Sequence, residues 1–269
     1  MDPRSNPRAS RPGASRRAWL RGAVAGGLPA LAAGLMPDAI RAAETAAARA
    51  GHVAPGALGA TPVIHAYDGW LLSDGQPATR IARAVWRWEP DGEAYRLAME
   101  IDSALIRLTY ESVGRLEPDG LRPLRYRESR KLPMRAARER VLRFDEAGPS
   151  AAGGEGGDPL VLPPGGQDRL SVVMQLALLA RARPARFSPG SEWVLPLASW
   201  RSVDDARFAV GPHETVDAGG RSLSAQRIRR VAAEADQAGI ELWLADDAAR
   251  TPVVIRFDDD GRALRFTLA

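Results

Sequence analysis

Cysteine is absent from this chain of 269 residues, and lysine occurs once, as Lys131. Without a thiol, the chain cannot form a disulfide, attack through a thiolate, ligate an iron–sulfur cluster through cysteine or carry a lipid on an N-terminal cysteine. Nearly all of the positive charge is on arginine, whose guanidinium stays protonated and cannot form a Schiff base. These absences exclude several classes of redox and covalent enzyme.

Most of the chain also lacks an excess of positive charge. The formal net charge is +4, but eight of the 37 basic residues and three of the 33 acidic residues fall in residues 1–50. From residue 51 onward, 29 basic residues face 30 acidic ones. Nucleic-acid binding depends on clustered cations that neutralise phosphates, so this nearly neutral remainder predicts no nucleic-acid partner.

The motifs of the common cofactor enzymes are missing as well. There is no dinucleotide fingerprint, Walker phosphate loop or nucleophile elbow, and the glycine cluster at 153–157 lacks the strand-to-helix context that phosphate binding needs. We therefore predict no cofactor. The acidic runs Asp246–Asp247 and Asp258–Asp260 fall at predicted turns, where aspartate is locally favoured, and we interpret them as turn residues.

Histidine is scarce, with His52, His65 and His213 widely separated along the chain. They lack the spacing of a helical metal site, so we predict no bound metal. A hydrolase that uses His65 or His213 with a nearby acid is the enzymatic alternative. It ranks below the binding functions, because the sequence shows no pairing of a nucleophile with a base.

The first 50 residues have the composition of an export signal. A run of the twin-arginine type precedes an apolar stretch rich in glycine and alanine, and small residues then predict cleavage between about residues 43 and 51. The apolar stretch is shorter than the roughly 20 residues of a membrane span, so we expect no permanent membrane anchor. We expect the twin-arginine or general export machinery to deliver a soluble periplasmic protein. The residues expected to be recognised are Arg16, Arg17, Trp19 and Leu20.

From residue 80 onward, apolar and polar residues alternate with the period of strands that have one buried face. The clearest runs are 95–101, 106–110, 124–126, 142–144, 253–257 and 264–268. An Asp-Gly pair at 260–261 lies between two such runs and is a strong hairpin signal. Other turn signals are Pro90–Gly92, Pro118–Gly120 and Ala218–Gly220. We predict a mainly β, α+β fold with a curved antiparallel sheet or an open β-barrel.

One segment has helical periodicity instead. Asp168 can cap a helix that runs to Ala182, and Pro184 prevents its continuation. The apolar face of this helix is broad, so we expect the curved sheet to enclose it. The stretch at 147–159 is rich in Gly, Ala and Pro and predicts a flexible loop. We assign residues 51–269 to a single β-rich domain.

Trp86 and Trp88 are two residues apart on a predicted strand and therefore share one of its faces. Such a pair fills a core or lines an apolar cavity, and core packing is the commoner outcome. Met174 from the helix and Trp243 from a later strand are the residues that we expect to join them. These four side chains are the candidate lining of an apolar cavity.

Several short runs carry a resemblance to a known family. They are Gly120–Tyr126, Arg143–Asp145, Gln167–Ser171, Leu242–Asp246 and Pro252–Ile255. In this order, over residues 62–269, the chain resembles the proteobacterial envelope family known as domain of unknown function 3108. The resemblance implies an exported protein without an established activity. It also implies a curved antiparallel sheet around a helix, similar by analogy to the half-barrels of periplasmic lipoprotein carriers.

Together, these patterns predict a periplasmic protein that binds an apolar ligand or an envelope component in a β-barrel-like cavity. Its partner would be a lipid or an envelope protein. The alternative is a structural or assembly module that docks on another envelope protein and holds no small molecule.

Overall fold

The computed structural model describes residues 61–72, 78–144, 151–152, 163–200, 202–231, 239–259 and 262–269. The expected export signal lies outside the described residues, together with its Arg16, Arg17, Trp19 and Leu20. Most of the predicted loop at 147–159 lies outside them too, and within it Ala151–Ala152 forms a short strand.

Within the described residues, the chain forms one 13-stranded sheet in which neighbouring strands are antiparallel. The strands before the helix are β1 (Val63–Leu72), β2 (Thr79–Asp91), β3 (Ala94–Ser103), β4 (Arg107–Glu117), β5 (Gly120–Lys131), β6 (Arg138–Phe144) and β7 (Ala151–Ala152). The strands after it are β8 (Glu192–Ala198), β9 (Val203–Ala218), β10 (Arg221–Val231), β11 (Gly239–Ala245), β12 (Pro252–Asp259) and β13 (Arg262–Leu268). The predicted antiparallel, mainly β fold is confirmed.

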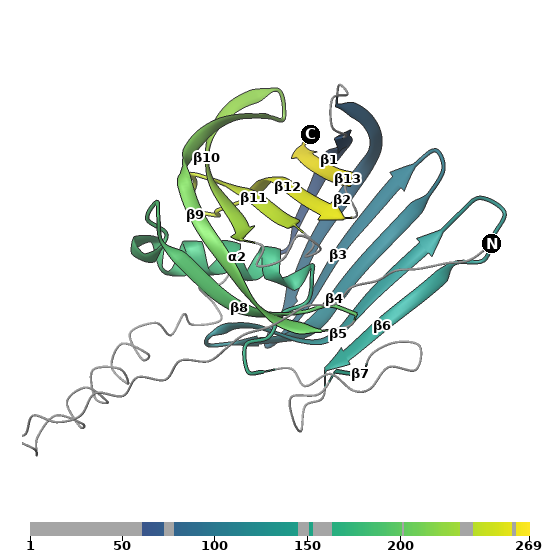
Figure 1. Ribbon diagram of the computed structural model, residues 1–269, viewed down its shortest axis with the longest axis horizontal. Coiled ribbons are helices and arrows are strands. Elements are labelled where there is room, and N and C mark those ends of the chain that lie inside the picture. The colour runs from purple at the N-terminus through teal and green to yellow at the C-terminus, as the bar shows by residue number, and fades with distance from the viewer. Residues whose placement is uncertain are drawn as a thin grey trace, which may run out of the picture. The chain divides into compact units, whose positions relative to one another are not determined.

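The order of the strands explains why the first and last of them meet in the middle of the sheet. Strands β1 to β7 follow one another outward to one edge, and strands β8 to β13 return from the opposite edge until β13 pairs with β1. Helix α2 (Ser171–Ala182) connects the two edges and lies in the concavity of the curled sheet (Figure 1). The sheet is therefore an open barrel whose two edge strands are β7 and β8.

The turn signals and the alternation both lead to the observed hairpins. Strands β2 and β3 meet across the turn after Asp91, β4 and β5 across the turn before Gly120, and β9 and β10 across the turn after Ala218. The predicted hairpin between β12 and β13 is also present, because Asp259 pairs with Arg262 across it. Local sequence therefore determines the strand connections in this protein.

Helix α2 supplies much of the core. Nine of its 12 residues are buried, and Val172, Val173 and Leu176 have no exposed surface, which confirms that the sheet encloses the helix. The short 3₁₀ helix η2 (Pro184–Arg186) follows directly. No helix in the described part of the chain is both long enough and apolar enough to cross a bilayer.

Asp168 caps the start of the helix, as predicted. Its carboxylate accepts hydrogen bonds from the backbone N–H groups of Leu170 at 2.8 Å and Ser171 at 2.7 Å, and its carbonyl accepts one from the N–H of Val172 at 3.1 Å. These are the bonds of an N-cap residue, and the regular helix follows from Ser171 after one turn.

Gln167, the residue before Asp168, joins the two halves of the sheet. The backbone N–H of Gln167 donates to the carbonyl of Pro196 on β8 at 2.8 Å, and its own carbonyl accepts from Ala198 at 2.8 Å. Its side-chain Nε2 donates to the carbonyl of Leu121 on β5 at 2.8 Å. Gln167 is fully buried and connects the edge strand of one half to an inner strand of the other.

Asp168 adds a second connection to the first half of the sheet. Ser112 Oγ on β4 donates to Asp168 Oδ2 at 2.6 Å, and the Tyr95 hydroxyl lies 3.0 Å from Ser112 Oγ. Burial raises the pKa of Asp168, although the hydrogen bonds from Ser112, Ser171 and Leu170 act to lower it. The carboxylate is thus the hydrogen-bonded centre of a buried polar cluster.

Trp200, which follows β8, makes a further contact across the open side of the barrel. Its ring lies 5.8 Å from that of Tyr126 on β5, measured between centroids. The Arg140 guanidinium on β6 lies 4.1 Å from the Trp200 ring centroid, within the range of a cation–π interaction. Packing of these side chains therefore brings the region after β8 close to β5 and β6, where no backbone pairing of described residues joins them.

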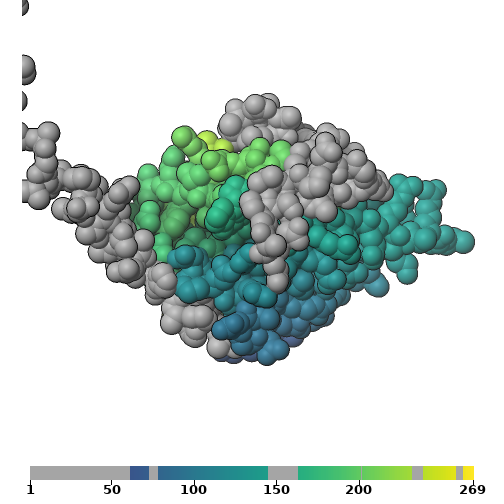
Figure 2. Space-filling model, turned by 90° about the horizontal axis from the view of Figure 1, so that it is seen from below, coloured from purple at the N-terminus to yellow at the C-terminus, as the bar shows by residue number. Residues whose placement is uncertain are grey.

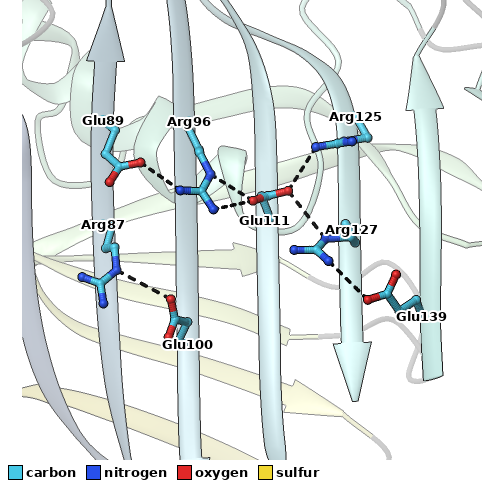
Figure 3. A network of polar contacts seen from close by, with 8 residues as sticks. All are labelled: Arg87, Glu89, Arg96, Glu100, Glu111, Arg125, Arg127 and Glu139. Carbon is cyan, nitrogen blue, oxygen red and sulfur yellow. Dashed lines mark hydrogen bonds and ion pairs between the residues drawn. The ribbon is translucent and has the colours of Figure 1, made fainter. Parts of the chain in front are cut away.

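The outer face of the first half carries an ion-pair network around Glu111 on β4 (Figure 3). Arg96 Nη2 lies 2.7 Å from Glu111 Oε2, and Arg125 Nη2 lies 3.1 Å from Oε1. Burial acts to raise the pKa of Glu111, but the hydrogen bond from Arg96 and the charges of Arg127, Arg96 and Arg125 hold it below its ordinary value. The network links three adjacent strands.

Replacing Asp168 tests the buried polar cluster. We expect Asp168→Ala to lower the free energy of unfolding by about 2–4 kcal/mol, because it leaves Ser112 and two backbone N–H groups without their acceptor. Asp168→Asn retains an acceptor oxygen and should cost less. Urea unfolding of each variant between about pH 4 and pH 8 measures this difference.

The pH dependence has a defined sign. Because the folded state raises the pKa of Asp168, it binds the proton more tightly than the unfolded chain does, and the wild type gains stability as the pH falls through the folded-state pKa. Asp168→Asn cannot take up this proton, so its deficit relative to the wild type should grow at lower pH. Equal losses for the alanine and asparagine variants at every pH would contradict this role.

Candidate functional site

The predicted tryptophan pair lies in the interior of the barrel. Trp86 and Trp88 are buried in the main core, and Trp88 stacks on Tyr95 with 5.5 Å between ring centroids. Met174 is partly buried and packs against the same core. Trp86, Trp88 and Met174 therefore all take part in the packing of the main core.

A small gap lies among core residues of the inner face. It has a volume of about 20 Å³, enough for about one water molecule, and is lined by Ile101, Tyr110, Tyr126, Arg169, Leu170, Phe257, Leu264 and Phe266.

Trp243 does not join the other two tryptophans. It lies between Leu242 and Leu244, both fully buried in the main core, so strand alternation turns its ring to the other face of β11. Its Nε1 donates to Glu214 Oε2 at 3.1 Å, and the Arg227 guanidinium lies 5.3 Å from its ring centroid. The same alternation in the sequence could have indicated this separation.

Trp243 belongs to a second apolar cluster beneath the bent hairpin of β9 and β10, which we call the arch (residues 209–228). The register between these strands shifts between Gln226 and Ile228, and a bulge of this kind bends a hairpin. Gly211 lies beside the shift, where a Cβ would come within 3.2 Å of the Arg227 carbonyl oxygen. In Figure 1 the arch curves over one end of the sheet.

A backbone hydrogen bond joins the tip of the arch to β13, the strand at the far side of the second half of the sheet. The Gly219 backbone N–H donates to the Leu268 carbonyl oxygen on β13 at 2.6 Å. Gly219 has φ of +59°, a left-handed conformation that glycine adopts without strain. Leu223 and Leu268 are partly buried against the second cluster from the two sides.

A pocket of about 570 Å³, which we call the arch pocket, lies at this end of the sheet. Its volume is in the range of small-molecule sites. Its apolar lining is Ile64, Ala66, Leu223, Ala245, Val253 and Leu268. Its polar lining includes His65, Arg221, Ser224, Asp246, Asp247 and Thr251. Strand β1, the arch, the turn between β11 and β12 and the end of β13 therefore all contribute to one cavity.

His65 brings a perturbed titratable group to the arch pocket. Partial burial lowers the pKa of its imidazole, and the negative charge of Asp247 partly offsets this effect. The imidazole also makes an edge contact with Tyr67, with 6.4 Å between ring centroids. The Tyr67 hydroxyl donates to the Pro252 carbonyl at 2.6 Å, which holds this part of β1 against the start of β12.

The acidic turn at Asp246–Asp247 is a turn, as predicted, and it also faces the pocket. Asp246 Oδ1 accepts a hydrogen bond from Arg250 Nη1 at 2.8 Å, and its Oδ2 lies 3.6 Å from Nδ1 of His213 on β9. The Asp246 backbone N–H donates to the Ser224 carbonyl at 2.9 Å. His65 and His213, which are distant in sequence, are thus both influenced by or close to this acidic turn. This arrangement was not predicted from the sequence.

The arch pocket combines aliphatic and polar side chains, which is the usual composition of a ligand site. In the described part of the chain, no group of three or more His, Cys, Asp or Glu residues is arranged to hold a metal ion. Neither His65 nor His213 receives a hydrogen bond from a hydroxyl group of a described residue.

Comparison with known proteins identifies the family. A family model described as "Protein of unknown function (DUF3108)" matches residues 67–268. This chain belongs to the DUF3108 family. The match confirms the resemblance seen in the sequence, and it covers every residue of the arch pocket except the start of β1 and the last residue.

Other comparisons add a structural likeness to this DUF3108 protein. It is similar to the crystal structure of a β-barrel-like protein of domain of unknown function DUF1849 from Brucella abortus, with 14% sequence identity and a TM-score of 0.45. The match covers 77% of this chain and 95% of that chain. No curated protein matches the sequence.

The electrostatic effect of Asp247 on His65 predicts a measurable titration in this DUF3108 protein. We expect the His65 pKa, followed by NMR of the imidazole C–H signals, to lie below the ordinary histidine value because of its burial. Asp247→Asn removes the charge that favours the imidazolium and should lower this pKa further. Asp246→Asn is the matched control and should move it less. An unchanged or raised pKa in Asp247→Asn would contradict the placement.

Proposed function

We propose that this protein binds a small amphipathic molecule in the arch pocket. One observation carries the proposal: a cavity of about 570 Å³ has aliphatic side chains along its walls and ionisable and hydroxyl groups beside them. Such a lining suits a ligand with an apolar body and a polar head. The proposal retains the expected binding function and relocates it from the tryptophan-lined interior to the arch.

The apolar body would lie against Ile64, Leu223 and Leu268. Ile64 is 64% exposed, an unusual degree of exposure for a large aliphatic side chain in a strand at the edge of a cavity. A ligand that covers it would remove this surface from water, with a gain of about 25 cal/mol for each Å² buried. Leu223 and Leu268 are already partly buried and would form the opposite wall.

The polar head would lie at the acidic turn. Asp246 is neutralised in part by Arg250, whereas Asp247 accepts a long hydrogen bond of 3.4 Å from the Thr251 backbone N–H. The carboxylate of Asp247 therefore has capacity for a further donor. A head group that donates hydrogen bonds, such as an amine, matches the carboxylate of Asp247.

Two exposed isoleucines allow a matched test of this site. We expect Ile64→Gln to weaken binding of dodecylamine at least about tenfold, because it places an uncharged polar amide in the apolar wall. Ile81→Gln changes another exposed isoleucine, on β2 and outside the pocket lining, and should change binding less than about twofold. Isothermal titration calorimetry of the three proteins provides the comparison.

The head-group preference is tested with lauric acid, which has the same apolar length and the opposite charge. We expect dodecylamine to bind more tightly than lauric acid, and Asp247→Asn to reduce the difference. If neither molecule binds, or if Ile64→Gln and Ile81→Gln have equal effects, the proposed site is wrong. An interaction module that holds no small molecule would then be the better hypothesis.

We also propose that the protein acts in the periplasm after export by the twin-arginine route. The Arg16–Arg17 pair with Trp19 and Leu20 supports this proposal. We expect Arg16→Lys with Arg17→Lys to leave the uncleaved precursor in the cytoplasm, as measured by cell fractionation and immunoblotting. Arg4→Lys with Arg8→Lys keeps the same charge outside the pair and should be exported normally. Normal export of the first variant would overturn the twin-arginine route.

A further inference from the structure

Two neighbouring hairpin tips carry exposed apolar side chains. Residues 104–106 connect β3 to β4, and residues 132–137 connect β5 to β6. The register places these connections side by side, because Arg107 pairs with Lys131. In Figure 1 both hairpins extend away from α2, and Figure 2 shows the teal β5–β6 hairpin projecting from the body of the protein. We call these tips and the strand ends that flank them, residues 102–107 and 130–138, the basic rim.

The apolar side chains of the basic rim are unusually open to solvent. Leu105 is 74% exposed, and Met134 has a relative exposure of 105%, the value of a side chain with no packing at all. Met134 also has φ of +55°, which is uncommon for a residue other than glycine. Exposing Leu105 and Met134 to water adds no stability to the fold. The two side chains therefore suit an apolar environment outside the protein.

Four cations accompany the exposed apolar side chains. They are Arg130, Lys131, Arg135 and Arg138, and in the part of the chain that the structure describes none of them takes part in an ion pair. Arginines on the adjoining outer face differ, because Arg96, Arg125 and Arg127 share the carboxylate of Glu111 (Figure 3). The four cations of the basic rim therefore keep their positive charge, whereas the arginines of the adjoining outer face are neutralised by Glu111.

We propose that the basic rim docks on an anionic lipid bilayer, with Leu105 and Met134 entering the interfacial region and the four cations contacting lipid headgroups. Separate apolar tips ringed by cations match the chemistry of a bilayer surface, in which apolar groups are buried shallowly and basic residues contact anionic lipids. A protein partner would require a broad complementary surface, with roughly 800 Å² buried on each side. Two projecting tips offer no such surface.

The basic rim and the arch pocket lie toward opposite ends of the strands. Val63 at the start of β1 is level with Trp88 and Leu97, whereas Gly69 is level with Ala82 and Ser103 near the rim. Docking is therefore independent of the proposed ligand site, and either proposal can fail without the other.

Flotation with large unilamellar vesicles tests the docking. The full chain and its variants are compared on vesicles of POPC alone and of POPC with 30% POPG, so that any contribution of residues 1–50 is common to all. We expect binding of the wild type to the anionic vesicles. At about fivefold per cation, Arg130→Gln, Lys131→Gln, Arg135→Gln and Arg138→Gln together should weaken this binding by at least about 100-fold.

A control variant removes the same charge elsewhere. Arg83→Gln, Arg143→Gln, Arg207→Gln and Arg229→Gln together change four exposed arginines outside the rim and should weaken binding less than about fivefold. Equal losses in the two quadruple variants would show attraction by overall charge and overturn the proposal. Equal binding of the wild type to both kinds of vesicle would overturn it as well.

The absence of cysteine allows a direct test of insertion. Met134→Cys and Val194→Cys each introduce a single thiol for an environment-sensitive NBD label, and Val194 is an exposed residue on β8 that lies outside the rim. We expect the label at position 134 to brighten and shift to shorter wavelength on POPG-containing vesicles, and the label at 194 to stay unchanged. An unchanged label at position 134 would overturn the insertion.

Discussion

The buried hydrogen bonds of Gln167 and Asp168 hold the two halves of the sheet around α2. Gln167 pairs through its backbone with β8 and through its side chain with β5, while Asp168 accepts a hydrogen bond from Ser112 on β4. Each of these groups is removed from water, so a lost partner would leave a buried polar atom unsatisfied at a cost of about 1–3 kcal/mol. The curled sheet, the enclosed helix and the position of Trp200 at the open side all depend on this connection.

Because the sheet is curled, its inner face and the region beside the arch differ in how closely they are packed. The inner face receives α2 and the tryptophan pair and keeps a gap of about 20 Å³, whereas a pocket of about 570 Å³ lies where the arch reaches β13. A bulge in the hairpin bends the arch far enough to reach a strand that is not its neighbour in the sheet. The pocket therefore lies where one of the register shifts of this antiparallel sheet bends a hairpin.

Much of the fold could be predicted, because period-two alternation and turn residues act locally. The hairpins, the enclosed helix and the shared face of Trp86 and Trp88 were all correct. The cap at Asp168 was correct too, because it depends only on residues next to it in the chain. Trp243 differs from the expectation: it faces away from the other tryptophans, because it alternates with two core leucines. The same alternation rule, applied to β11, would have indicated this.

The sequence alone determined the family, the strand connections and the absence of thiol chemistry, since each depends on residue type or on neighbours along the chain. Only the tertiary structure decided where a ligand could bind. His65, Leu223 and Asp247 come from three strands or turns that are distant in sequence, and no local pattern relates them. They meet because β1 pairs with β13 while the arch bends back to Leu268, and pairings between distant segments leave no periodic trace in the sequence.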